Sequence, residues 1–304
     1  MHLFSILLSI ISLAVPTLPI IEHEPYISNS KIRADRVFSI TEDVNVPEKI
    51  DSASLGPRLS AGSALVVDAE SGAVLFEKDG NISWPMASIV KLMTALVFLE
   101  ADIVLEERVE MTEEDEREGG EDFIRPGESS SLRDYLTASL LGSANNATIV
   151  LSRSIGISTQ EFVNRMNQRA KELGMRDTKF VEPSGLDPEN TSTSYDMVRL
   201  LNAIRDNEII ADITGTHQSF IRIYPSGFSR RVLTTNHLLG SIVFVEYGKT
   251  GYLDESLHNL ATLVSTNNGN ELYIVTLGSE TNEDRVQDAK NLAVWAERVY
   301  RWNL

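Results

Sequence analysis

Hydrophobic positions in the first half of the chain predict a strand pair followed by a block of helices. Two apolar runs, 64–67 and 73–76, flank a Glu-Ser-Gly turn, as in a hairpin. A nearly uninterrupted apolar run over 87–100 follows Pro85 and predicts a helix that is buried on both sides. Helical spacing then recurs at 132–141, 146–154, 158–174 and 195–205.

The last third of the chain returns to strands. Runs 260–265 and 272–277 flank Asn-Asn-Gly-Asn, a hairpin signal, and an amphipathic helix is predicted over 284–301. This order of elements is typical of an α+β fold and not of alternating βαβ units.

The N-terminus is strongly apolar. Residues 3–21 include a short core typical of a signal peptide, with small residues near Ala14 for cleavage. An uncleaved anchor is the alternative, although two prolines make the run marginal for a spanning helix, which needs ~20 apolar residues. We therefore expect a signal peptide or membrane anchor over 1–21, a linker over 22–59, and one main domain over 60–304.

Composition excludes several classes of function. The 304 residues are 42% hydrophobic, enough for a sizeable core, and the net charge of −17 argues against nucleic acid as a partner. The absence of cysteine rules out disulfides, thiolate–zinc sites and a cysteine nucleophile. No histidine pair has HExxH spacing, so we expect no metal site and no cofactor.

Ser88 and Lys91 form the first candidate catalytic pair. Their spacing of three places both side chains on one face of the predicted helix. Serine needs a base to accept its proton, and a lysine can be that base when burial or a nearby cation keeps it neutral. A helix N-terminus also offers backbone N–H groups to a developing oxyanion.

Two further motifs give this pair its context. Ser143-Ala144-Asn145 separates two helical segments, and Lys249-Thr250-Gly251 leads into strand-like sequence. Each motif is weak alone, because chance copies of the first two patterns occur at 28–31 and 265–267. Their order resembles that of the penicillin-recognising serine acyltransferases.

The flanking residues narrow the resemblance. The segment Pro85-Met86-Ala87-Ser88-Ile89-Val90-Lys91 is similar to the active-site helix of the low-molecular-weight D-alanyl-D-alanine carboxypeptidases, peptidase family S11. Further similar segments lie at 162–167, 173–175, 183–186 and 248–252. The resemblance covers roughly 60–300 and implies a β-lactamase/transpeptidase-like fold, an antiparallel sheet flanked by helices plus a mostly helical subdomain.

The resemblance implies a role for each motif residue. Ser88 would attack the carbonyl between two D-alanines, Lys91 would be the general base, and Ser143 would relay a proton to the leaving amine. Asn145 would bind a substrate amide, and Lys249, Thr250 and Arg285 would bind the terminal carboxylate. Gly251 would let the strand approach the substrate closely. The backbone N–H of Tyr252 would join that of Ser88 in the oxyanion hole.

The chain departs from the family pattern in two places. Ala144 and Asn146 replace the usual glycine and aspartate, and larger residues follow the Lys-Thr-Gly motif at 253–257. We expect the latter to narrow the cleft while the nucleophile and base stay intact. No C-terminal β-domain is expected, so membrane attachment would come from the N-terminal segment.

The implied function is a D-Ala-D-Ala carboxypeptidase that trims peptidoglycan stem peptides and is inhibited covalently by β-lactams. Export to the periplasm or the outer face of the bacterial cytoplasmic membrane follows. A D,D-endopeptidase would use the same residues and stays open. A class A β-lactamase is disfavoured, because residues 198–202 come nearest to the required E-x-x-L-N motif but lack its glutamate. A non-catalytic cell-wall binding protein is the remaining alternative.

Overall fold

The computed structural model describes Val37 and residues 44–302. The expected signal peptide or anchor over 1–21 lies outside the described residues, as does most of 22–43. Within the described part of the chain, no helix has both the length and the hydropathy that a membrane crossing requires.

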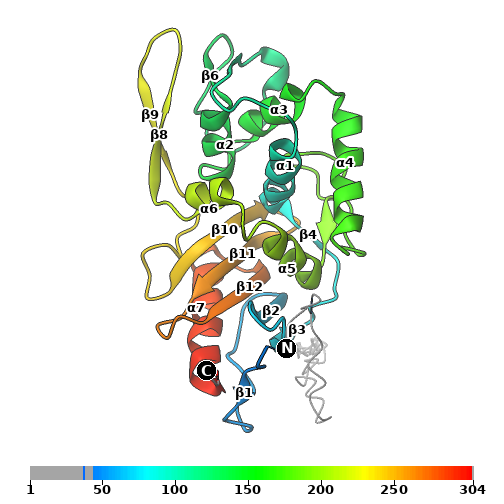
Figure 1. Ribbon diagram of the computed structural model, residues 1–304, viewed down its shortest axis with the longest axis vertical. Coiled ribbons are helices and arrows are strands. Elements are labelled where there is room, and N and C mark those ends of the chain that lie inside the picture. Colours follow the sequence, from blue (N-terminus) through cyan, green and yellow to red (C-terminus); the bar gives the residue numbers. More distant parts are fainter. Residues whose placement is uncertain (1–36, 38–43, 303–304) are drawn as a thin grey trace, which may run out of the picture. The chain divides into compact units, whose positions relative to one another are not determined.

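One antiparallel sheet of five strands, ordered β10-β11-β12-β2-β3, lies between the C-terminal helix and the helical part of the chain (Figure 1). The N-terminal hairpin of β2 and β3 joins the C-terminal strands because β2 pairs with β12, with Val66 opposite Ile274. The α+β prediction and both predicted hairpins are confirmed. The strands are β2 (Ser63–Asp68), β3 (Val74–Lys78), β10 (Phe244–Leu253), β11 (Leu257–Ser265) and β12 (Glu271–Ser279).

The sheet is covered on both faces, so its central strands are almost wholly buried. Successive side chains of a strand point to opposite faces. Val66 and Ile274 pack with Leu292 of the terminal helix α7 (Asn282–Val299). The neighbouring residues Leu65 and Val275 pack instead with the helical subdomain.

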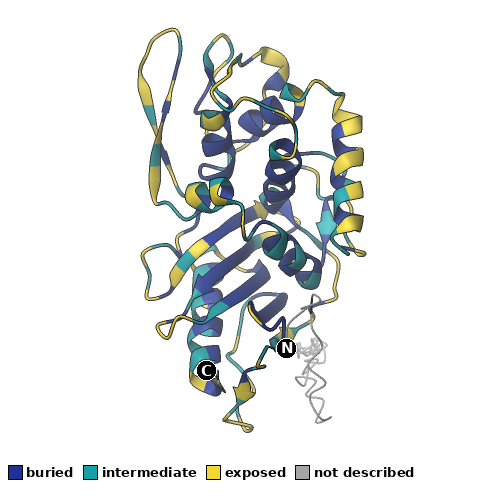
Figure 2. Cartoon of the chain, viewed as in Figure 1, coloured by how far each residue is buried: buried dark blue, intermediate teal, exposed yellow. Residues whose placement is uncertain are grey.

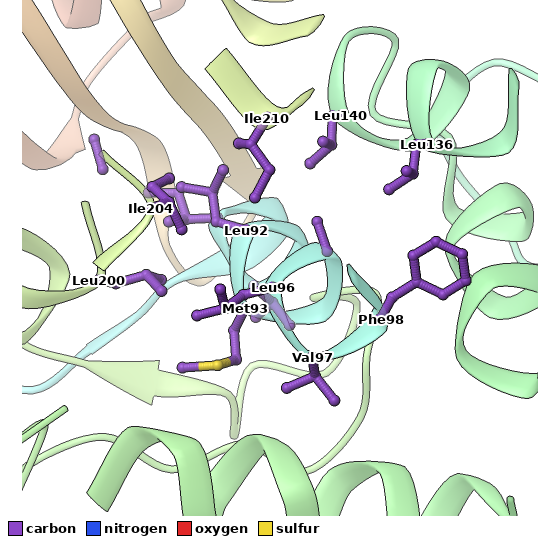
Figure 3. Packing of buried hydrophobic residues seen from close by; sticks show 14 of the residues in the cluster. Leu92, Met93, Leu96, Val97, Phe98, Leu136, Leu140, Leu200, Ile204 and Ile210 are labelled. Atoms are coloured by element: carbon purple, nitrogen blue, oxygen red, sulfur yellow. The ribbon is translucent and has the colours of Figure 1, made fainter. Parts of the chain in front are cut away.

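The helical subdomain surrounds α1 (Val90–Leu99), which is buried from Val90 to Phe98, as its apolar sequence predicts (Figure 2). Figure 3 shows α1 packed against leucine and isoleucine side chains of α2, α5 and α6. The other helices are α2 (Leu132–Leu140), α3 (Asn145–Ser154), α4 (Thr159–Glu172), α5 (Ser194–Ala203) and α6 (Glu208–Thr214).

Four short strand pairs complete the described structure. Three of them join β4 (Trp84–Pro85) to β7 (Thr191–Ser192), β5 (Arg108–Glu110) to β6 (Ser129–Ser131), and β8 (Gln218–Arg222) to β9 (Ser229–Leu233). Single turns of 3₁₀ helix, η1 (Ala87–Ile89) and η2 (Glu113–Asp115), precede α1 and follow β5.

The fourth pair corrects the expected domain boundary. β1 (Glu48–Lys49) pairs with β13 (Tyr300–Arg301), although we expected residues 22–59 to be a linker. Trp295 donates a hydrogen bond of 2.8 Å from Nε1 to Ser54 Oγ, and Leu59 packs against the core beneath α7. These contacts include residues 44–59 in the domain.

Candidate active site

Ser88 and Lys91 are brought together by the turn that starts the buried helix. Ser88 lies in η1, directly before α1, and its side chain is half-buried, whereas Lys91 is fully buried. The Nζ of Lys91 donates a hydrogen bond of 2.9 Å to Ser88 Oγ. An accessible hydroxyl thus lies beside an amine that is shielded from water.

Burial favours the neutral form of the Lys91 amine, whereas the three hydrogen bonds that Nζ donates favour the ammonium form. Burial lowers the pKa of Lys91 to about 7, although the negative charge of Glu182 acts in the opposite direction. Nζ also donates to Asn145 Oδ1 at 2.7 Å and to the Ser184 carbonyl at 2.5 Å. At neutral pH a large fraction of this lysine can therefore accept a proton.

A second serine–lysine pair faces the first. The Nζ of Lys249, on β10, donates to Ser143 Oγ at 2.9 Å and to its neighbour's carbonyl, Thr250 O, at 3.1 Å. Ser143 has a φ of +62°, an unusual conformation for a residue other than glycine. Burial lowers the pKa of Lys249 well below its usual value, and the charges of Lys91 and Arg285 lower it further.

Asn145 reaches Lys91, but the rest of its amide is already engaged. Nδ2 donates to the carbonyls of Glu118, at 3.0 Å, and Gly119, at 2.8 Å. These two contacts orient the side chain so that its oxygen faces Lys91. The expected hydrogen bond to a substrate amide would require the loop carbonyls to release Nδ2.

Thr250 and Gly251 connect β10 to the rest of the site. The Thr250 hydroxyl is hydrogen-bonded to that of Thr235, 2.7 Å away, a residue that our sequence analysis did not identify. A Cβ atom on Gly251 would lie 2.8 Å from Met86 O and 3.2 Å from Ser88 N. Glycine therefore lets the strand contact the Ser88 turn directly.

The side chain of Tyr252 lies at the surface, whereas that of Arg285 lies in the interior. The Tyr252 side chain is exposed and its ring lies 4.5 Å from that of His258, between centroids. The Arg285 guanidinium is buried and donates to the carbonyls of Gly251, at 3.2 Å, and Asn259, at 3.3 Å, and to Asn282 Oδ1. Arg285 thus holds the Lys-Thr-Gly strand through its backbone.

The family model for D-alanyl-D-alanine carboxypeptidases, Peptidase_S11, matches residues 49–281. The chain belongs to this family. It is therefore a serine peptidase, a hydrolase, and the site described above contains the three motifs on which the resemblance rests.

Named relatives and solved structures agree with this assignment. The chain is 33% identical over 246 residues to a D-alanyl-D-alanine endopeptidase of Pseudomonas aeruginosa, covering 80% of this chain and 79% of the relative. It is 31% identical over 240 residues to the carboxypeptidase DacF of Bacillus subtilis, covering 76% and 61%.

Among solved structures, a D-alanyl-D-alanine carboxypeptidase of Mycobacterium tuberculosis matches with a TM-score of 0.75 and 28% identity, over 81% of this chain and 94% of that one. The Streptomyces K15 DD-transpeptidase matches with a TM-score of 0.76 at 21% identity, over 81% of this chain and 100% of that one, and shows the shared fold. The predicted β-lactamase/transpeptidase-like fold is confirmed.

The departures from the S11 pattern have structural roles. Asn146 is buried and its Nδ2 donates to Asp122 Oδ1 and to Ile124 O, both at 3.2 Å. It thereby attaches the loop that contacts Asn145. Ser256 is also buried and closes the β10–β11 turn, because its hydroxyl accepts from Leu253 N at 3.0 Å.

Proposed function

We propose that this S11 protein is a serine-type D-Ala-D-Ala carboxypeptidase that removes the terminal D-alanine from peptidoglycan stem peptides. The observation that carries the proposal is the contact of 2.9 Å between the buried Lys91 amine and the Ser88 hydroxyl. A serine with such a partner can act as a nucleophile at neutral pH.

In the acylation step, neutral Lys91 accepts the proton of Ser88 Oγ as the oxygen attacks the carbonyl carbon between the two D-alanines. The N–H groups of Ser88 and Tyr252 stabilise the negative oxygen that forms. The C–N bond then breaks, and Ser143 passes a proton to the departing amine of D-alanine. Water hydrolyses the resulting ester on Ser88 and regenerates the enzyme.

Substrate binding uses the second half of the site. We propose that the Thr250 hydroxyl and the side chains of Lys249 and Arg285 bind the terminal carboxylate. Asn145 would bind the peptide amide once the carbonyls of Glu118 and Gly119 release its Nδ2. Each of these roles follows from the family resemblance, and Arg285, like Asn145, would have to give up present hydrogen bonds in order to bind substrate.

The same proposal includes the cellular setting. We propose that the protein is exported and acts in the periplasm or on the outer face of the cytoplasmic membrane, with residues 1–21 cleaved or retained as an anchor. β-Lactams would acylate Ser88 and act as covalent inhibitors, because their strained amide is attacked by the same nucleophile.

A D,D-endopeptidase is the second candidate. Relatives from P. aeruginosa and Escherichia coli that are 33% and 30% identical to this chain are named endopeptidases. Such an enzyme would cut a D-alanyl bond within a cross-link with the same nucleophile and base.

The test is D-alanine release from a soluble peptide ending in Lys-D-Ala-D-Ala, using the full chain beside its Ser88→Ala variant. Release by the wild type that disappears in the variant is the expected result. Cleavage of cross-linked muropeptide dimers without release from the linear peptide would favour the endopeptidase. No cleavage of either substrate by folded protein would contradict both candidates.

A further inference from the structure

Glu182 collects an unusual number of hydrogen bonds at the edge of the active site. It lies within the loop between α4 and α5. Its carboxylate accepts from the backbone N–H groups of Ser184, at 2.7 Å, Leu186, at 2.9 Å, and Gly185. The Ser184 hydroxyl and Asn190 Nδ2 also donate to it, at 2.5 and 2.7 Å. A single carboxylate therefore determines the conformation of this loop.

The loop contacts both members of the catalytic pair. The Ser184 carbonyl accepts a hydrogen bond from Lys91 Nζ, and the Pro183 carbonyl accepts one from Thr94, one turn further along α1. Gly185 lies so close to the Ser88 turn that a Cβ on it would be 2.9 Å from Ser88 N. A change in the loop would thus be transmitted to the base and to the backbone of the nucleophile.

Charge gives Glu182 a second connection to Lys91. The groups facing Lys91 are Ser88 from η1, Asn145 from α3 and the Ser184 carbonyl from the loop, and all of these are neutral. The negative charge that acts on Lys91 is that of Glu182, whose carboxylate favours the ammonium form. The nearby amine of Lys249 on β10 has a pKa that is lowered by burial first and then by the charge of Lys91.

We propose that Glu182 is a positioning residue for the Ser88–Lys91 pair: it holds the Ser184 carbonyl against the Lys91 amine and supplies the negative charge that balances the ammonium formed during acylation. This inference rests on the proposed role of Lys91 as the general base. Glu182 does not touch the reacting atoms and acts through the loop.

A carboxylate is needed here because every neighbour of its two oxygens is a donor. In Glu182→Gln, an amide NH₂ group would face N–H or hydroxyl donors and the negative charge would be lost. In Glu182→Asp, the charge would stay, but the shorter side chain could not reach all of these donors. The two variants therefore separate the charge of Glu182 from its hold on the loop.

The experiment measures the rate of acylation of the full chain by a fluorescent penicillin as a function of pH. In the wild type, the rate rises with pH as Lys91 loses its proton. In Glu182→Gln, we expect this rise to shift to lower pH by roughly one unit, the lower end of the effect of an opposite charge within a few ångströms. We also expect the plateau rate to fall about tenfold, since misplacing a catalytic group by an ångström costs up to ~10²-fold.

Glu189→Gln is the matched control. Glu189 lies on the same loop and also carries a negative charge, but its side chain is 69% exposed and pairs with Lys179 at the surface. We expect this variant to keep the wild-type pH profile and rate. A folded Glu182→Gln variant with the same pH profile as Glu189→Gln would overturn the inference.

Glu182→Asp tests the same inference if Glu182→Gln does not fold. We expect its rise with pH to stay at the wild-type position while its plateau falls; a wild-type plateau would overturn the inference. The failure of the proposed function looks different, because the wild type itself would then not be acylated at Ser88. If the wild type is acylated and the Glu182 variants have the same acylation rate and pH profile, the inference is overturned while the proposed function stands.

Discussion

Gly185→Ala should disturb the site through the backbone alone. Gly185 has a φ of +87° and packs against the turn that contains Ser88. A Cβ atom there would lie 2.2 Å from the carbonyl oxygen of Ala87 and 2.9 Å from the backbone nitrogen of Ser88. Both neighbours are backbone atoms, so no flexible side chain can move aside to relieve the clash.

The magnitude follows from two terms. A left-handed conformation costs a residue with a Cβ roughly 1–2 kcal/mol, and overpacking a tight contact costs typically 1–3 kcal/mol more. We expect Gly185→Ala to lower the free energy of unfolding by about 2–5 kcal/mol. At about 2–4 °C per kcal/mol for a domain near this size, Tm would fall by about 4–20 °C.

Activity should fall further than stability alone explains. Moving the Ser88 N–H away from the oxyanion position removes a donor that is worth ~10²–10³ in rate. We expect acylation by a fluorescent penicillin, measured well below Tm where the variant is folded, to slow by about a hundredfold.

Gly156→Ala is the control for backbone strain. Gly156 has a similar φ of +74°, but no atom lies within 4 Å of the position of its Cβ. We expect it to lose only about 1–2 kcal/mol and to be acylated at the wild-type rate. If Gly185→Ala matched Gly156→Ala in both measurements, the close contact between the loop and the Ser88 turn would be refuted.

Three further predictions concern the base and the fold. Lys91→Arg should abolish acylation, because a guanidinium does not deprotonate near neutral pH; normal labelling of a variant with a wild-type circular dichroism spectrum would contradict the role of Lys91. The rate of acylation of the wild type should rise with pH with a midpoint of about 7, the lowered pKa of Lys91. A rise only near pH 10 would show that the Lys91 amine is not desolvated. Asp288→Ala should lower the free energy of unfolding, measured in urea, by about 2–4 kcal/mol. Buried Asp288 accepts hydrogen bonds from Ser60, Ala61 and Ser279, and its loss leaves their donors unpaired. A change below about 0.5 kcal/mol would contradict this role of Asp288.

Local sequence predicts the contact between Ser88 and Lys91 well. Their spacing along one helical turn places the two side chains together, and the apolar run around them predicts the burial of the lysine. The long helices and the two hairpins likewise follow from periodicity. The contact of Lys249 with Ser143 depends on tertiary packing, and the family resemblance implied only that both residues belong to the site.

Other parts of the site leave no mark in the sequence. The Ser184 carbonyl that contacts Lys91, and the Glu118 and Gly119 carbonyls that contact Asn145, are backbone groups that any residue could supply. The proposed role of Glu182 depends on the hydrogen-bond donors that surround its carboxylate only in the folded loop. Such acceptors can be found only once the chain is placed in three dimensions.

The N-terminal boundary shows the same limit. β1 is only two residues long, and its partner β13 lies about 250 residues away in sequence. A pair this short has no periodicity to detect, so residues 44–59 were expected to be linker. Arg285 is comparable, because its bonds to Gly251 and Asn259 arise from the packing of α7 beside the sheet.

The central claim is that Ser88 is the nucleophile, and mass spectrometry tests it most directly. The full chain is treated with benzylpenicillin, its intact mass is measured, and the modified residue is located by proteolysis and peptide sequencing. We expect one penicilloyl group per chain, attached to Ser88 and absent from Ser88→Ala. A folded wild type that gains no adduct, or an adduct that persists in Ser88→Ala, would contradict it.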